Sequence, residues 1–241
     1  LRRPTKAADL FGGFGFRETH WREGDLLYTK AADDLIGVYA ILETAIALRK
    51  QKSKAPFIGL LSRAEEVGFI GTIAHLELGW LKGAKRKLLA VSLETSRTMP
   101  GAEIGKGPVV RLGDRKSVFD SGATQVFSNL AAKVLPGKHQ RKLMDGGTCE
   151  GTAATAYGIP TIAISVPLGN YHNQSFEGGP DAAPTNGPAP EFVSLSDIEG
   201  MGSVTRSVMM PKLGWDQPFV ATVNGFKKSL KNYRKLLRTG P

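Results

Sequence analysis

Apolar residues recur along the chain in two patterns that alternate with each other. The clearest helical pattern covers residues 34–50, where apolar side chains return every three or four positions and a basic pair closes the segment. Continuous apolar runs, which are typical of strands buried on both faces of a sheet, follow at three places: residues 57–61, 88–93 and 161–166. We therefore expect a helix followed by three buried strands.

Weaker patterns complete this alternation. We expect further strands at residues 25–29 and 109–112. We expect further helices at residues 70–81, 123–135 and 152–157. A final helix is expected to begin at Ser196, within the capping-box sequence Ser-Asp-Ile-Glu. Residues 167–190 are rich in glycine, proline and asparagine, which is typical of a functional or mobile loop. The alternation predicts a three-layer α/β/α fold with a largely parallel, mixed central sheet.

The last helical pattern combines an apolar stripe with a concentration of positive charge. Its apolar residues recur at helical spacing: Phe226, Leu230, Tyr233 and Leu237. Its basic residues are Lys227, Lys228, Lys231, Arg234, Lys235 and Arg238. We expect an amphipathic terminal helix that docks on the body through its apolar stripe and leaves its basic face in solvent.

Composition narrows the classes of function. With 241 residues, 41% hydrophobic and 22% charged, the chain can form an ordinary globular domain with a substantial core. No apolar run approaches the roughly 20 residues that cross a bilayer, so we expect no membrane segment and no membrane partner. The net charge of +10 is accompanied by no nucleic-acid motif, and we expect no nucleic-acid partner. The single cysteine, Cys149, excludes an internal disulfide and fits a reducing, cytoplasmic compartment.

Acidic residues and one histidine stand beside the expected strands. Asp33 opens the first helix, Glu65 and Glu66 follow the first buried strand, Glu94 closes the second, and His172 follows the third. Ligands bind beyond the carboxyl ends of strands in open α/β sheets, so we expect these residues to meet at one rim. Singly, Asp33 could be a first-turn helix acid and His172 an ordinary loop residue. Together, carboxylates and an imidazole suit a divalent metal, or two metals if one carboxylate bridges them.

Five segments in the same order carry a family resemblance. They are residues 31–38 (Ala-Ala-Asp-Asp-Leu-Ile-Gly-Val), residues 62–71 (Ser-Arg-Ala-Glu-Glu-Val-Gly-Phe-Ile-Gly), Leu93-Glu94-Thr95, Gly146-Gly147-Thr148 and Tyr171-His172. They resemble segments of the co-catalytic dinuclear zinc aminopeptidases, and most closely those of the glutamyl and deblocking (tetrahedral) aminopeptidase family. The Glu-Glu-Val-Gly element with the downstream Tyr-His is the most specific part of the resemblance.

The resemblance implies a metal-dependent aminopeptidase that hydrolyses N-terminal residues from peptides with a water activated by two metals. Asp33 would bridge two divalent ions, Glu66 and His172 would complete one metal site, and Glu94 would belong to the other. Glu65 would be the catalytic general base. Zinc is the expected metal, with cobalt and manganese as alternatives. The expected partners are a peptide substrate and further copies of the chain in a homo-oligomer.

The sequence also departs from the family pattern. The family's first ligand histidine lies in a His-x-Asp segment upstream of the bridging aspartate, and no such segment occurs here. His20 lies in the sequence His-Trp-Arg, and we do not expect it to be the ligand. We expect residues 1–241 to form a single metallopeptidase-like catalytic domain that lacks an N-terminal portion with this histidine. Leu35 stands in place of an arginine and Cys149 in place of an aspartate, so the residue preference does not transfer.

Two other functions fit the same residues. An N-acyl amino acid deacylase of the same fold would use the same set of carboxylates. A non-catalytic scaffold or assembly subunit would keep the fold after losing a metal ligand. A His-x-Asp segment upstream of Leu1 would support the enzyme, whereas its absence from the complete gene product would favour the scaffold.

Overall fold

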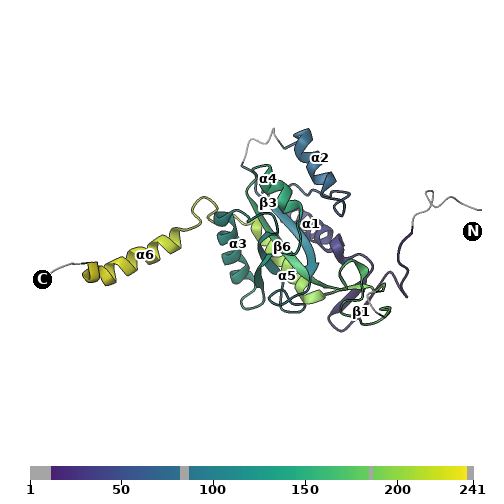
Figure 1. The fold of residues 1–241 in the computed structure, drawn as a ribbon. Coiled ribbons are helices and arrows are strands. Elements are labelled where there is room, and N and C mark those ends of the chain that lie inside the picture. Colours follow the sequence, from purple (N-terminus) through teal and green to yellow (C-terminus); the bar gives the residue numbers. More distant parts are fainter. Residues whose placement is uncertain (1–11, 82–86, 185–186, 238–241) are drawn as a thin grey trace, which may run out of the picture.

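The computed structural model of the chain describes residues 12–81, 87–184 and 187–237, which are arranged around one mixed β-sheet (Figure 1). In chain order the elements are β1 (His20–Glu23), β2 (Leu26–Thr29), α1 (Ala32–Lys50), α2 (Ile70–Leu78), β3 (Ala90–Arg97), β4 (Val109–Asp114), α3 (Ser121–Val134), β5 (Gln140–Met144), α4 (Glu150–Ala156), β6 (Thr161–Gly169), the 3₁₀ turn η2 (Tyr171–Asn173), β7 (Glu191–Ser194), α5 (Leu195–Val208), α6 (Val220–Tyr233) and the 3₁₀ turn η3 (Arg234–Leu237).

β6 is the central strand of the sheet. It pairs in parallel with β3 along one edge, and β4 and β7 share its other edge, both antiparallel to it. β5 pairs in parallel with β4, while β2 and β1 continue the sheet in antiparallel fashion beyond β7. The mixed sheet is confirmed, but the prediction that it is largely parallel is wrong. Parallel neighbours need a crossover, and the described part of the connection between the neighbouring strands β6 and β7 contains no α-helix.

Helices cover both faces of the sheet, which confirms the three-layer α/β/α architecture. α1, α3 and α5 pack on one face, to which β6 contributes four fully buried side chains: Ile162, Ile164, Val166 and Leu168. On the opposite face, Ala163 of β6 contacts Phe119 and Cys149, the residue that caps α4. Burial of each large aliphatic side chain stabilises the fold by about 1.5–3 kcal/mol, so β6 forms the centre of the core.

The predicted buried strand over residues 57–61 does not form. Ile58 is 67% exposed, and the segment is an irregular loop. Gly59 passes close to α1, where a Cβ atom would lie 2.7 Å from Cγ2 of Ile41. The apolar run therefore crosses a helix and has no partner strand. Without a partner strand, its backbone N–H and C=O groups cannot form the hydrogen bonds of a sheet. The following pair of glutamates consequently stands after a loop.

Most other elements form close to their predicted positions. α2 begins at Ile70 as expected but ends at Leu78, because Gly79 adopts a left-handed conformation (φ 69°) and closes the helix. α5 begins at Leu195, one residue before the predicted start at Ser196, and its cap is Ser194, whose side chain accepts a hydrogen bond from the backbone N–H of Asp197. β1, β5 and β7 are additional strands, too short to show a clear period in the sequence.

The C-terminal helix α6 and the turn η3 extend away from the body (Figure 1). None of their described residues is buried, so the prediction that this helix docks on the body through its apolar stripe is wrong for the described structure. The chain leaves the body after Pro218, which packs against Gly122 at the start of α3. Among the described residues, no helix has the length and hydropathy needed to cross a membrane.

Candidate metal centre

The five candidate residues line one cleft of about 630 Å³ near the ends of β3 and β6. They are Asp33 at the start of α1, Glu65 and Glu66 in the loop before α2, Glu94 in β3 and His172 in η2. Segments that are far apart in the sequence therefore meet at this place. The geometry brings the five side chains together, and the catalytic or ligand role of each stays a prediction.

Three of these residues lie close enough together to hold one metal ion. Ligand atoms of Asp33, Glu66 and His172 all lie within 4.8 Å of one another. Nε2 of His172 is 3.4 Å from Oε2 of Glu66 and 3.9 Å from Oδ2 of Asp33. Two carboxylates and one imidazole fit zinc or a similar divalent ion. The Glu66 side chain is 59% exposed, so water or a substrate can reach this side of the cluster.

A tight turn presents the two glutamates. The backbone N–H groups of Gly68 and Phe69 donate hydrogen bonds to the carbonyl oxygen of Glu65, at 2.8 and 2.9 Å. Gly68 has φ of 103°, in the region that glycine enters without steric cost. The glycine of the Glu-Glu-Val-Gly motif therefore closes the turn that places Glu65 and Glu66 in the cleft.

A buried asparagine fixes the loop that carries His172. Asn170 is fully buried, and its side-chain amide donates hydrogen bonds to the carbonyl oxygens of Gly178 and Pro190, at 2.8 and 2.9 Å. Its side-chain oxygen accepts a bond from the N–H of Glu177, whose carboxylate in turn accepts one from the N–H of Asn170. Asn170 and His172 both adopt left-handed conformations, which asparagine tolerates better than most residues. Sequence reasoning missed this role of Asn170.

Asp33 stands in a buried acidic environment. Burial raises its pKa to about 6, with a smaller contribution from the charge of Glu66, while the nearby Thr95 side chain lowers the pKa in part. The carboxylate of Glu191 in β7 accepts a hydrogen bond from the backbone N–H of Asp33 at 3.1 Å, and burial raises the Glu191 pKa to about 7. The peptide bond between Asp33 and Asp34 is cis. Crowded carboxylates of this kind favour the binding of a cation.

Glu65 is half-buried at the edge of the same group. Its pKa is raised to about 7, first by burial and then by the charges of Glu150, Glu66 and Asp33. Glu150, the first residue of α4, accepts a hydrogen bond from the Ser62 hydroxyl at 3.4 Å. Sequence reasoning missed Glu150, although it lies directly after the Gly-Gly-Thr-Cys stretch. A carboxylate with a pKa near neutrality has the acid–base strength that a general base needs.

Glu94 has a different set of partners from the three clustered residues. Its Oε2 is 3.5 Å from a guanidinium nitrogen of Arg111, and its Oε1 accepts a hydrogen bond from Ser92 at 2.7 Å. Burial raises the pKa of Glu94, and Arg111 opposes that rise. Arg111 is buried and was not predicted; its position in β4 places it opposite β3 across β6. The described residues therefore fit one ion, whereas a second ion at Glu94 would compete with the Arg111 guanidinium.

Two residues that differ from the family pattern lie outside the cluster. His20 is exposed on β1, with its ring nitrogen Nδ1 3.3 Å from the Thr19 hydroxyl. Cys149 is fully buried, and its thiol donates to Oδ2 of Asp114 at 3.6 Å. Neither side chain lines the cleft.

The family model for M42 glutamyl aminopeptidases matches residues 14–177, which include all five candidate residues. The chain belongs to this family. The M42 chain is also similar in fold to archaeal aminopeptidase structures, all less than 25% identical to it. A TET aminopeptidase from a marine sediment archaeon of the Thaumarchaeota has 22% identity and a TM-score of 0.62, with 86% of this chain and 53% of that chain covered.

Two further structures have the same fold as this M42 chain. An aminopeptidase from Desulfurococcus kamchatkensis has 17% identity and a TM-score of 0.63, with 82% of this chain and 53% of that chain covered. The TET1 peptidase of Pyrococcus horikoshii, described as assembling into a tetrahedron or a large octahedral shell, has 19% identity and a TM-score of 0.59, with 82% and 54% covered. The M42 chain spans about half the length of these solved proteins.

Proposed function

We propose that this chain carries the active site of a metal-dependent aminopeptidase that removes N-terminal residues from peptides. One observation carries the proposal: Asp33, Glu66 and His172 converge within 4.8 Å in a cleft of a chain that belongs to the M42 family. Zinc is the proposed metal, and cobalt or manganese would suit the same oxygen and nitrogen donors. The aminopeptidase names of the structurally similar proteins support the reaction class.

The side chains divide the chemistry between them. Asp33, Glu66 and His172 would hold the ion, which when bound would polarise the scissile carbonyl and lower the pKa of a coordinated water. The carboxylate of Glu65 would accept a proton from the attacking water and then deliver that proton to the leaving amine. The buried Asn170 would keep His172 in position during turnover.

The second ion of the predicted pair is a separate proposal. Asp33 would bridge the two ions, and Glu94 would hold the second. Arg111 already supplies a positive charge beside Glu94. A second ion could therefore bind at Glu94 only if the guanidinium moved away or a further ligand also bound the ion. We derive no catalytic step from this second position.

The structurally similar proteins also bear on assembly. A homo-oligomer is proposed because similar structures are described as a dodecamer and as tetrahedral or octahedral shells. The cytoplasmic location predicted from the single cysteine stays a prediction.

The decisive experiment measures substrate cleavage and metal content on the same preparation. The purified chain, stripped with chelator and then supplied with Zn, Co or Mn, should release the N-terminal residue from aminoacyl-nitroanilides and short peptides. Hydrolysis of N-acyl amino acids in place of peptides with a free N-terminus would favour the deacylase.

His172→Ala tests the metal site directly. This variant should lose one metal equivalent by elemental analysis, whereas His75→Ala, which changes a histidine outside the cleft, should keep it. Unchanged stoichiometry in His172→Ala would exclude the proposed ligand. A parent protein that binds no metal and cleaves neither substrate would favour the scaffold.

A further inference from the structure

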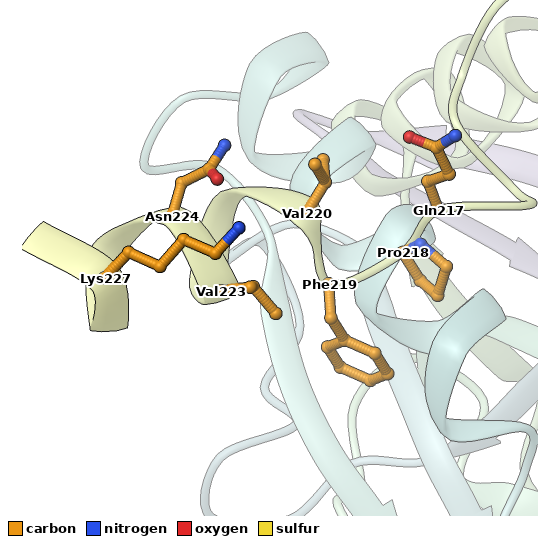
Figure 2. Close-up of a pocket in the computed structure, with 7 residues that line it drawn as sticks. All are labelled: Gln217, Pro218, Phe219, Val220, Val223, Asn224 and Lys227. Atoms are coloured by element: carbon orange, nitrogen blue, oxygen red, sulfur yellow. The ribbon is translucent and has the colours of Figure 1, made fainter.

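The α6–η3 segment stands apart from the body of the fold. It lies beyond the residues matched by the family model, which end at 177. Figure 2 shows the junction, where Pro218 and Phe219 lead into the helix. Pro218 packs against Gly122, and no described residue from Val220 onward is buried. The segment therefore contributes nothing visible to the core or to the metal centre.

An apolar stripe runs along one side of this helix. Its members follow one another at spacings of four and three residues: Phe219, Val223, Phe226, Leu230 and Tyr233. At about 100° per residue, these positions fall on a single narrow face. Figure 2 shows Phe219 and Val223 turned to the same side of the segment, with Asn224 on the other side. Phe226 is 69% exposed and Tyr233 is 64% exposed, so the stripe is uncovered in this structure.

The positive charge lies along one flank of the stripe. The basic residues are Lys227, Lys228, Lys231, Arg234 and Lys235, and no aspartate or glutamate occurs from Gln217 to Leu237. The opposite flank holds small or uncharged residues: Ala221, Thr222, Gly225, Ser229 and Asn232. None of the five basic side chains forms an ion pair within the described part of the chain.

The apolar stripe and the basic flank together indicate the kind of partner that the segment can bind. A second copy of the helix offers a matching apolar stripe but brings five more positive charges and no acid to pair with them. Nucleic acid would neutralise the charge but would leave the aromatic and aliphatic stripe in water. An anionic lipid surface satisfies both, because the stripe can enter the boundary of the acyl chains while the long lysine and arginine side chains reach the headgroups.

We propose that the α6–η3 segment docks on the surface of a bilayer that contains anionic lipids. The helix would lie in the plane of the interface, with Phe226 and Leu230 buried among lipids and the basic flank against the headgroup phosphates. The proposal does not depend on the aminopeptidase function, because the segment shares no residue with the metal centre.

Vesicle flotation tests the proposal with the whole chain. We expect the protein to float with vesicles of phosphatidylcholine and phosphatidylserine but not with phosphatidylcholine alone, and to detach as salt is added. Lys227→Gln, Lys228→Gln and Lys231→Gln combined should weaken binding by roughly a hundredfold, since each charge contributes to surface attraction. The matched control changes the exposed Lys50, Lys52 and Lys54 to Gln, removes the same charge elsewhere, and should bind like the parent.

A second pair of variants tests the apolar stripe. Phe226→Ser and Leu230→Ser alter exposed side chains, so the fold should persist by circular dichroism while binding to anionic vesicles is lost. Absence of binding by the parent would overturn the proposal, as would equal loss in the Lys50 control. A dimer that depends on Phe226 in light scattering, without vesicle binding, would overturn it in favour of a second copy.

Discussion

Replacement of Glu65 by glutamine is the sharpest test of the proposed chemistry. Glutamine keeps the size of the side chain and its place in the turn closed by Gly68 but cannot accept and return a proton. Loss of a general base costs about 10²–10⁴ in turnover, which corresponds to roughly 2.7–5.4 kcal/mol in the activation free energy at about 1.36 kcal/mol per tenfold.

The structure predicts which other properties should stay unchanged. Glu65 is absent from the three-residue cluster, and its negative charge raises the pKa of neighbouring carboxyls, so glutamine removes repulsion and leaves the metal ligands in place. The neighbouring Glu66→Gln is the matched control. It makes the same chemical change one residue away and should lose metal, because the Glu66 carboxylate belongs to the cluster.

The assay compares turnover of an aminoacyl-nitroanilide with metal content and pH. In the parent, activity should fall at a pH below about 7, since the carboxylate of Glu65 is then protonated and cannot act as a base. An ion bound to Glu66 would move this fall to lower pH. The part of the fall that comes from Glu65 should be missing in Glu65→Gln. A Glu65→Gln variant with parental turnover, or with lost metal, would refute the assignment of the base.

Three further predictions concern the fold. Phe127→Ala, at a fully buried position in the core, should lower the free energy of unfolding by about 3–5 kcal/mol in urea denaturation, whereas Val118→Ala, exposed to 73%, should change it by less than about 0.5 kcal/mol. Burial raises the pKa of Asp114, but hydrogen bonds from the Thr152 hydroxyl and the 116–117 backbone outweigh this effect and leave the pKa below its usual value. The ionised Asp114 carboxylate thus stabilises the fold above the pKa that it has in the unfolded chain, and this stabilisation is lost as the pH falls through its pKa in the folded protein. The loss of unfolding free energy in Asp114→Asn, measured by urea denaturation, should therefore shrink below about pH 4. Burial also raises the pKa of the Cys149 thiol, so it should react with Ellman's reagent only after denaturant is added, and rapid native reaction would contradict its burial.

The sequence predicts those features of the fold that depend on local periodicity. Residues 161–166 are a continuous apolar run. The structure places them in the central strand of the sheet, where every side chain is buried. The run at 57–61 has the same appearance but lies across α1. A periodic pattern reports how apolar a segment is, whereas strand formation also needs a partner edge, and that depends on distant parts of the chain.

The candidate site shows the same division. Asp33, Glu65 and Glu66 stand in recognisable motifs, and the structure places them in one cleft. Glu191 and Arg111 stand in no motif. They contact Asp33 and Glu94 only because strand pairing brings distant parts of the chain together. Their influence on neighbouring charges could not be read from spacing in the sequence.

The central place of β6 has a consequence for synthesis of the protein. β3 and β4 both pair with β6 and not with each other, and the register joins Ala90 to Thr161. While the chain is being translated, these two early strands therefore keep unpaired edges until residues 161–169 leave the ribosome. Such long-range pairing slows folding and leaves apolar edges open to aggregation. Nascent chains that stall before β6 should be the species that chaperones retain.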